Sequence, residues 1–220
     1  MDKFTPEFSR EFAEGRINLL PASQRPANLD ILLTVIFDPT VMPKKVNQAE
    51  GQDLIVTSAT NIYDEGITQP EVEAYYAALK DTTDLTPISY GLNTRKTKVD
   101  GKIVEQPYKV GGLYTEAIER IVKELKAASG YAENPGQKAY IDKLIEYYTT
   151  GDLKTFDEYS ILWSEETAAQ VDFINGFIES YDDPLGMTGS WESIVNFKNN
   201  EASARTETLS TNAQWFESNS

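Results

Sequence analysis

The sequence predicts an α+β fold in which an antiparallel sheet of four or more strands packs with several amphipathic helices. Three observations lead to this: an Asp100-Gly101 pair between two strand-like runs, an apolar stripe along Tyr114–Ala128, and side-chain alternation over Val171–Lys198. The predicted order along the chain is helices, hairpin, helices, hairpin, helix. Segregated helices and hairpins of this kind are typical of α+β domains rather than of parallel-sheet folds.

The first third of the chain is predicted to form short helices joined by loops. Thr5-Pro6 opens a short helix that carries Phe8 and Phe12, because proline is favoured at the first helical position. Leu29–Phe37 is a short apolar run that pattern alone cannot assign to helix or strand. Thr68-Gln69-Pro70-Glu71 has the spacing of a capping box, which predicts a helix after it. The buried stripe of that helix is expected to be Val72, Tyr75, Tyr76 and Leu79.

A hairpin is predicted where Ile88–Val99 and Lys102–Val110 flank Asp100-Gly101. An Asp-Gly pair between strand-like runs favours a type I′ turn, because both central residues need positive φ. Gly111-Gly112 is expected to end this hairpin.

Three helices should follow, and a fourth should close the chain. The first carries the stripe Tyr114, Ala117, Ile118, Ile121, Leu125 and Ala128 and ends near Gly130. The second is capped by Asn134 and ends at Gly151, with a predicted buried stripe of Ile141, Leu144, Ile145 and Tyr148. Phe156–Trp163 is expected to form the third, and Glu201–Phe216 a polar final helix.

The segment Val171–Lys198 is predicted to be two strands joined by a loop at Asp182–Gly186, with the second strand over Ser190–Phe197. Alternate residues of a strand share one face. This places Glu179 and Tyr181 side by side, roughly 7 Å apart, at the end of an otherwise apolar strand. Their predicted face also carries Phe173, Asn175 and Phe177.

Composition excludes several classes of function. The 220 residues carry a formal net charge of −15, which opposes nucleic acid or an anionic membrane as partner. The chain has no cysteine and no histidine, so thiol nucleophiles, Ser-His-Asp catalysis and the usual zinc sites are excluded. A carboxylate site for magnesium or calcium stays open. The polar start after Met1 has no signal-peptide pattern, which predicts a cytoplasmic protein if Met1 is the true start.

The residues by themselves leave the role of the strand-end side chains open. Glu179 could simply reach solvent, and Tyr181 could cap a core with its hydroxyl in water. Asp182-Asp183 is more typical of a turn than of a metal site, and Trp191 of a core. Glu179 and Glu192 could do acid–base work, bind an ammonium group, or flank a sugar as in a carboxylate-pair glycosidase.

A resemblance favours one of these roles. NGFIESYDDPLG followed by SWESIVNF resembles the peptide-binding segment of the dipeptidyl peptidase III family of zinc exopeptidases, and bacterial members in particular. The likeness covers nearly the whole chain. It extends through Ser89–Asn93, Lys109–Glu116, Thr150–Tyr159 and Asn212–Glu217.

The resemblance implies an enzyme that removes dipeptides from the free N-terminus of short peptides. Members have a helical lobe, which holds zinc on an HExxxH-type helix, and a lobe with a small β-barrel against which the peptide lies. By resemblance, Glu179 and Glu192 would hold the ammonium group of the substrate and Tyr181 would stabilise the developing oxyanion. The predicted sheet would then be barrel-like and belong to that second lobe.

One departure from the family is decisive. Without histidine the chain has no HExxxH helix and no cofactor site of its own, so we expect a fragment that is inactive alone. Residues 1–200 would be the substrate-binding lobe, and 201–220 a polar helix leading toward the missing zinc lobe. Surface exposed by truncation would favour self-association. The alternatives are a non-catalytic module that captures short peptides with a free N-terminus, and a structural or oligomerisation unit.

Overall fold

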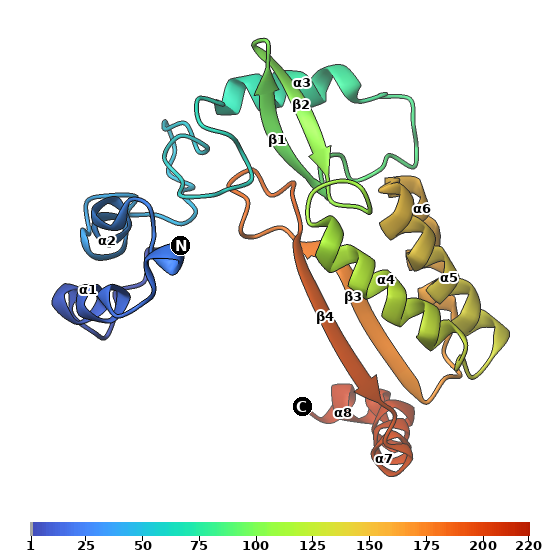
Figure 1. Ribbon diagram of the computed structural model, residues 1–220. Helices are drawn as coiled ribbons and strands as arrows, with labels where there is room; N and C mark the ends of the chain where they lie inside the picture. Colours follow the sequence, from blue (N-terminus) through green and yellow to red (C-terminus); the bar gives the residue numbers. More distant parts are fainter. Residues whose placement is uncertain (1) are drawn as a thin grey trace. The chain divides into compact units, whose positions relative to one another are not determined.

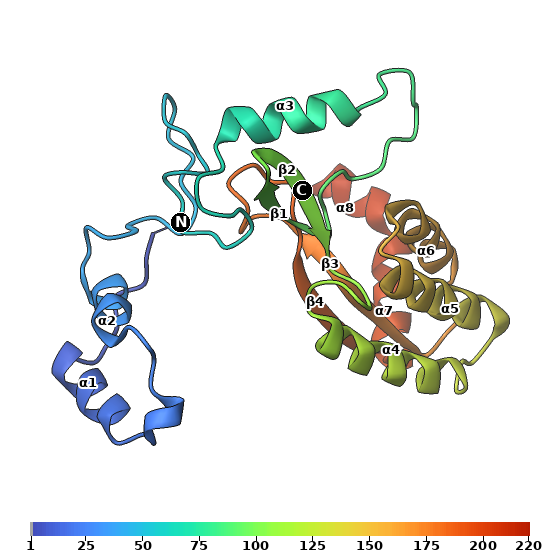
Figure 2. The same ribbon diagram turned by 45° about the horizontal axis from the view of Figure 1, so that its top comes forward.

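The computed structural model describes residues 2–220 and confirms an α+β fold (Figures 1 and 2). These residues contain eight α-helices, one short 3-10 helix at Ala22–Gln24 and two antiparallel sheets of two strands each. The chain divides into two compact units. Unit 1 comprises residues 2–108 and Glu179–Ser190, and unit 2 comprises Lys109–Ile178 and Trp191–Ser220.

Unit 1 begins with two helices of nine residues each, α1 (Arg10–Asn18) and α2 (Leu29–Phe37). The prediction that Thr5-Pro6 opens the first helix is wrong. Ser9 is the N-cap, because its hydroxyl accepts a hydrogen bond from the backbone N–H of Phe12 at 3.2 Å. Phe8 therefore precedes the helix, and its ring meets that of Phe37 edge-on at 5.9 Å.

Helix α3 (Gln69–Leu79) begins as predicted. Thr68 and Glu71 form both halves of the capping box, which satisfies backbone N–H groups that a helix start leaves free. Val72 and Tyr76 are buried in the core of unit 1, whereas Leu79 is 44% exposed. The predicted stripe is correct at its N-terminal end and wrong at Leu79.

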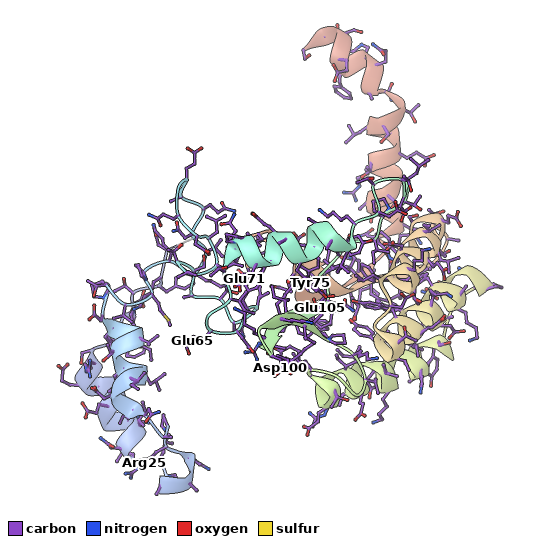
Figure 3. The ribbon with its side chains drawn as sticks, turned by 90° about the horizontal axis from the view of Figure 1, so that it is seen from above. Arg25, Glu65, Glu71, Tyr75, Asp100 and Glu105 are labelled. Atoms are coloured by element: carbon purple, nitrogen blue, oxygen red, sulfur yellow. The ribbon has the colours of Figure 1, made fainter. Side chains whose placement is uncertain are left out.

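The first sheet pairs β1 (Thr94–Val99) with β2 (Lys102–Pro107), and Val99 lies opposite Lys102. Asp100 and Gly101 have φ of 49° and 74°, which confirms the tight turn with two positive φ angles. Both strands are shorter than predicted. Figure 3 shows the labelled Tyr75 of α3 beside Glu105 of β2, so this helix lies against the hairpin.

Unit 2 is built around three helices, α4 (Thr115–Ser129), α5 (Pro135–Thr150) and α6 (Leu153–Glu165), which lie side by side in Figures 1 and 2. Asn134 caps α5 by accepting from the N–H of Gln137 at 2.9 Å, as predicted. Gly151 ends that helix with a φ of 73°, a conformation that residues with a side chain rarely adopt. Helix α6 is longer at both ends than the predicted Phe156–Trp163.

The second sheet pairs β3 (Val171–Glu179) with β4 (Ser190–Phe197). Within unit 2, the ring of Phe173 contacts Tyr140 at 5.6 Å and that of Phe177 contacts Tyr148 at 6.5 Å, so one face of β3 packs on α5. The predicted single final helix is two, α7 (Asn200–Thr211) and α8 (Ala213–Asn219), because the backbone leaves helical geometry at Asn212.

The prediction of one barrel-like sheet with four or more strands is not met within residues 2–220, where the four strands form two separate pairs and no closed barrel. Alternation of side chains identifies strands and their faces, but it does not say which strands pair. No described helix is long and apolar enough to cross a membrane.

Candidate functional site

The predicted site residues Glu179 and Tyr181 belong to unit 1, whereas Glu192 belongs to unit 2. Glu179 is the last residue of β3 and its side chain is exposed. The strand stops there because the next four residues form a turn, closed by a hydrogen bond from the N–H of Asp183 to the carbonyl of Ser180 at 3.0 Å.

Tyr181 lies in this turn and not in the strand, so the prediction that strand alternation continues through Tyr181 is wrong. Its side chain is 62% exposed. The phenol is thus available to a ligand from solvent, and its position is set by the turn rather than by the pleat of β3. We call residues 180–190 the Tyr181 loop.

Asp183 holds the Tyr181 loop together from the inside. It is 1% exposed, and its carboxylate accepts hydrogen bonds from the backbone N–H groups of Leu185 at 2.9 Å and Thr188 at 2.7 Å. The N–H of Met187 donates as well, and the hydroxyl of Tyr63 lies 2.8 Å from one oxygen and 3.0 Å from the other. A carboxylate that accepts several hydrogen bonds inside a protein is stabilised in that position. Asp183 forms a turn, as its sequence context indicates, and also anchors the loop to the core.

Lys96 of β1 lies under the same loop with no exposed surface. Its ammonium donates to the hydroxyl of Thr188 and to the carbonyls of Gly91 and Thr94, both at 3.1 Å. Burial lowers the pKa of Lys96 to about 8, and the negative charges of Asp183 and Glu105 oppose this shift. The ammonium also lies 5.6 Å from the ring centre of Tyr63, within range of a cation–π interaction.

Gly91 makes this arrangement possible. Its φ is 81°, and a Cβ atom built there would lie 2.5 Å from the hydroxyl of Tyr76, which is closer than such atoms approach. Its carbonyl accepts from both Lys96 and the hydroxyl of Thr188, the latter at 3.1 Å. Any other residue would be strained at this φ and would press on the hydroxyl of Tyr76 and the ammonium of Lys96.

Two further contacts fix the edges of the loop. Lys45 forms an ion pair with Asp182 at 2.6 Å, and the N–H of Gly189 donates to the carbonyl of Leu92 at 2.7 Å. The loop is therefore attached to segments at three different places in the sequence of unit 1.

In unit 2, Glu192 is half-buried on β4, next to Trp191. The indole N–H of Trp191 donates to the hydroxyl of Tyr148 at 3.0 Å, and that hydroxyl donates to the side chain of Asn175. The amide of Asn175 lies 3.3 Å from the hydroxyl of Ser193. These contacts tie β4 on both sides of Glu192 to β3 and α5. Whether Glu192 joins Glu179 and Tyr181 stays a prediction.

The described residues do not fit a zinc ion. The sequence has no histidine or cysteine, and no group of three or more acidic side chains within residues 2–220 is placed to hold a metal. Any zinc chemistry would need ligands that this sequence does not contain.

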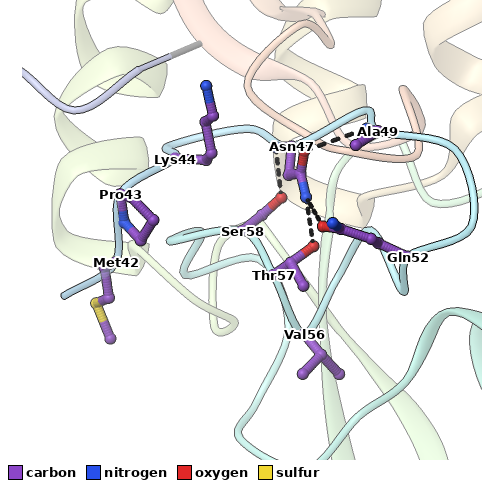
Figure 4. Close-up of a pocket in the computed structure, with 9 residues that line it drawn as sticks. All are labelled: Met42, Pro43, Lys44, Asn47, Ala49, Gln52, Val56, Thr57 and Ser58. Atoms are coloured by element: carbon purple, nitrogen blue, oxygen red, sulfur yellow. Dashed lines mark hydrogen bonds between the residues drawn. The ribbon is translucent and has the colours of Figure 1, made fainter. Parts of the chain in front are cut away.

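A separate hollow in unit 1 is lined in part by Met42, Lys44 and Val56 (Figure 4). Its buried polar residue, Asn47, has its hydrogen-bonding groups committed within the protein. The amide donates to Gln52 at 2.7 Å and Thr57 at 2.9 Å, and the carbonyl accepts from the N–H of Ala49 at 3.1 Å. This polar group therefore serves to shape the loop around it and is not available to a ligand.

The sequence analysis did not find Lys96 or Tyr63. In β1, Thr94, Lys96 and Lys98 alternate as a polar face would, and a polar face is normally solvated. Only the folded structure shows that two of the three are buried. The sequence holds one indirect sign of a buried lysine. The turn segment Asp182-Asp183 carries two adjacent acids, and one of them could pair with such a lysine.

The geometry defines an exposed acid at the end of β3, followed by an exposed phenol on a loop that buried hydrogen bonds anchor. Comparison with known proteins assigns the chain to a class. The model of the peptidase family M49 matches residues 46–218. The chain belongs to this family of peptidases.

The relatives are dipeptidyl peptidases 3, which confirms the resemblance to the dipeptidyl peptidase III family. The protein of Dictyostelium discoideum is 25% identical over 84% of this chain, and that of Homo sapiens is 33% identical over 47%. The chain spans 25% and 14% of these relatives, respectively.

The fold is similar to that of two solved structures of the same name. The dipeptidyl peptidase III of Caldithrix abyssi matches with a TM-score of 0.59 and 21% identity. The match covers 96% of this chain and 38% of the Caldithrix chain. That of Corallococcus sp. strain EGB has a TM-score of 0.53 and 23% identity, over 72% of this chain and 28% of its own. At these identities the likeness concerns the fold alone.

Proposed function

We propose that this chain is the substrate-binding part of a family M49 peptidase that removes dipeptides from the N-terminus of short peptides. In this proposal Glu179 and Glu192 bind the ammonium group of the peptide, and Tyr181 donates a hydrogen bond to the carbonyl oxygen that gains negative charge. The observation that carries it is the Tyr181 loop, which holds an exposed phenol two residues after an exposed carboxylate in a chain of this family.

The chemistry of these groups suits the role. An ionised carboxylate forms a strong hydrogen bond with an ammonium group, and the bond strengthens as water is excluded. A phenol on a fixed loop can be aimed at the place where charge develops, which is the requirement for lowering a transition-state energy. The two hairpins would belong to the β-barrel lobe of such an enzyme, and zinc would be held by residues that this sequence does not supply.

Titration with peptides tests the binding role. The purified chain is mixed with a tetrapeptide that has a free N-terminus and, separately, with its N-acetylated form. We expect preference for the free amine, and loss of that preference in Glu179→Gln. A matched control is Glu165→Gln, another exposed glutamate at the end of a regular element. Equal binding of both peptides by the wild-type chain would contradict the proposal.

A second candidate is a peptide-binding module without catalytic function, which is favoured by the lack of any histidine in the sequence. Both candidates predict that the chain alone binds peptides and releases no dipeptide. The two candidates differ in what they predict for the reading frame around the codons of Met1 and Ser220. A frame that continues and encodes an HExxxH helix supports the enzyme, and dipeptide release by the 220-residue chain alone contradicts both.

A further inference from the structure

Two buried tyrosines in the core of unit 1 each donate a hydrogen bond to a carboxylate. Tyr63 donates to Asp183 at 2.8 Å, and Tyr76 donates to Glu105. The two phenols are 6% and 2% exposed, and burial raises the pKa of each well above its ordinary value. Both therefore stay protonated donors at neutral pH. They differ in what they hold, since Asp183 belongs to the Tyr181 loop and Glu105 to β2.

The contacts of Asp183 act directly on the turn that carries Tyr181. Its backbone N–H closes that turn by donating to Ser180, and its side chain binds the backbone on the far side of the loop, at Leu185, Met187 and Thr188. Movement of this carboxylate would therefore move both halves of the loop. Tyr63, which lies outside the loop and 120 residues earlier in the chain, donates a hydrogen bond to this carboxylate.

Lys96 completes the attachment from below. It binds Thr188 at the end of the loop, and Thr188 in turn donates its backbone N–H to Asp183. A chain of hydrogen bonds thus runs from Tyr63 through Asp183 and Thr188 to Lys96. All four residues are buried, so water does not compete for these bonds.

We propose that Asp183, held by Tyr63 and Lys96, is a positioning residue that fixes the turn of Tyr181 so that this phenol and Glu179 meet a peptide in one arrangement. Groups that are held in place before binding lose little conformational freedom when the ligand arrives. Tyr181 is exposed and gains its order from the turn beneath it. The inference rests on the proposed function for its role in peptide binding, but not for its claim about the turn.

The matched pair Tyr63→Phe and Tyr76→Phe tests the inference in the full chain. Each change removes one buried hydroxyl from the same core, but the hydroxyl of Tyr63 donates to the Tyr181 loop, whereas that of Tyr76 donates to β2. Two quantities are measured: the NMR signal of the Tyr181 ring in chains with ¹³C-labelled tyrosine, and the affinity for the tetrapeptide with a free N-terminus. The ring signal is assigned by its loss in Tyr181→Phe.

We expect Tyr63→Phe to shift or broaden the Tyr181 signal and to weaken peptide binding about tenfold, through loss of a pre-ordered loop. Tyr76→Phe should leave both unchanged. Asp183→Asn, which replaces one acceptor oxygen by an N–H donor and loses the charge, should weaken binding at least as much as Tyr63→Phe.

The outcomes separate the inference from the proposed function. An unchanged Tyr181 signal in Tyr63→Phe, or equal changes in both phenylalanine variants, overturns the positioning role. A Tyr181 signal that changes only in Tyr63→Phe, in a chain that binds no peptide, supports the positioning role and overturns the proposed function instead.

Discussion

The two units of this protein are stabilised by different kinds of interior. Unit 2 buries mainly aliphatic and aromatic side chains between three helices, and Leu144, Tyr147 and Tyr148 have no exposed surface. Unit 1 buries an apolar cluster as well, formed by Ile55, Ile62, Tyr63, Ile67, Val72 and Tyr76. Next to it, however, lie a buried lysine and a buried aspartate, which unit 2 does not match within residues 2–220.

This difference follows from local structure. In unit 2 the backbone groups are largely paired within long helices, so side chains only need to fill space. In unit 1 the irregular Tyr181 loop leaves backbone N–H groups that a helix or sheet would have paired, and Asp183 accepts three of them. Unit 1, which carries Tyr181, thus buries polar groups that hold a loop, whereas unit 2 buries mainly apolar side chains.

The largest effect should come from breaking the polar interior of unit 1. Asp183→Ala leaves Tyr63, three backbone N–H groups and the charge of Lys96 without their partner, so we expect a loss of about 3–5 kcal/mol in unfolding free energy. Urea unfolding followed by hydrogen exchange of unit 1 amides measures it. Asp182→Ala, which removes a partly exposed ion pair with Lys45 and a long hydrogen bond from Ser190, should cost about 1 kcal/mol or less. Equal losses in Asp183→Ala and Asp182→Ala would show that the buried contacts of Asp183 stabilise unit 1 no more than an exposed ion pair does.

The second-largest loss of unfolding free energy should come from shortening a buried apolar side chain in unit 2. Leu144 is 0% exposed at the centre of α5, so Leu144→Ala should cost about 3 kcal/mol from lost transfer energy and the cavity left behind. Protection of amides in α4 to α6 reports this loss. Ile161→Ala on α6, where the side chain is 57% exposed, serves as the control and should change protection little.

The next effect in size should be a dependence of the stability of unit 1 on pH. The pKa of Lys96 is about 8 when folded and 10.5 ordinarily, so between these values the unfolded chain binds a proton that the folded chain has released. Stability of unit 1 should therefore rise with pH, by about 1.5 kcal/mol from pH 8 to 9.5.

Lys96→Met should lack this rise, whereas Lys98→Met, which changes a partly exposed lysine of the same strand, should keep it. Unfolding by urea at several pH values measures both. Parallel curves for the wild-type chain and Lys96→Met would show that the burial of Lys96 does not shift its protonation.

Helix caps should give the smallest effect and should not distinguish the units. Thr68→Ala removes half of the capping box of α3 in unit 1, and Asn134→Ala removes the cap of α5 in unit 2. Each lost cap should cost about 1 kcal/mol, because a cap satisfies local N–H groups whatever the core behind it. Asn134→Ala also loses a hydrogen bond to Glu166 at 3.0 Å. Circular dichroism during thermal unfolding measures both changes. A cost several times larger in one unit would mean that its cap also has a tertiary role.

Local signals predicted most of the elements correctly. The Asp100-Gly101 turn, the capping box at Thr68 and the helix end at Gly151 were all found where expected, because each depends on the conformational preference of one or two residues. Boundaries were less accurate. The first helix begins at Arg10, four residues after Pro6, the predicted first position, since the hydroxyl of Ser9 provides the cap instead.

The sequence by itself determined the α+β class, the helices of unit 2, the two hairpins and, through the segment Val171–Lys198, the peptidase family. These follow from periodicity, turn chemistry and a specific motif, all of which are local along the chain. Only the tertiary structure decided that the strands form two separate pairs, that Tyr181 sits in a turn, and that Lys96 and Asp183 are buried together. The shared burial of Lys96 and Asp183 depends on contacts between residues about 90 to 120 positions apart, Lys96 with Thr188 and Tyr63 with Asp183, and no pattern within a short window contains them.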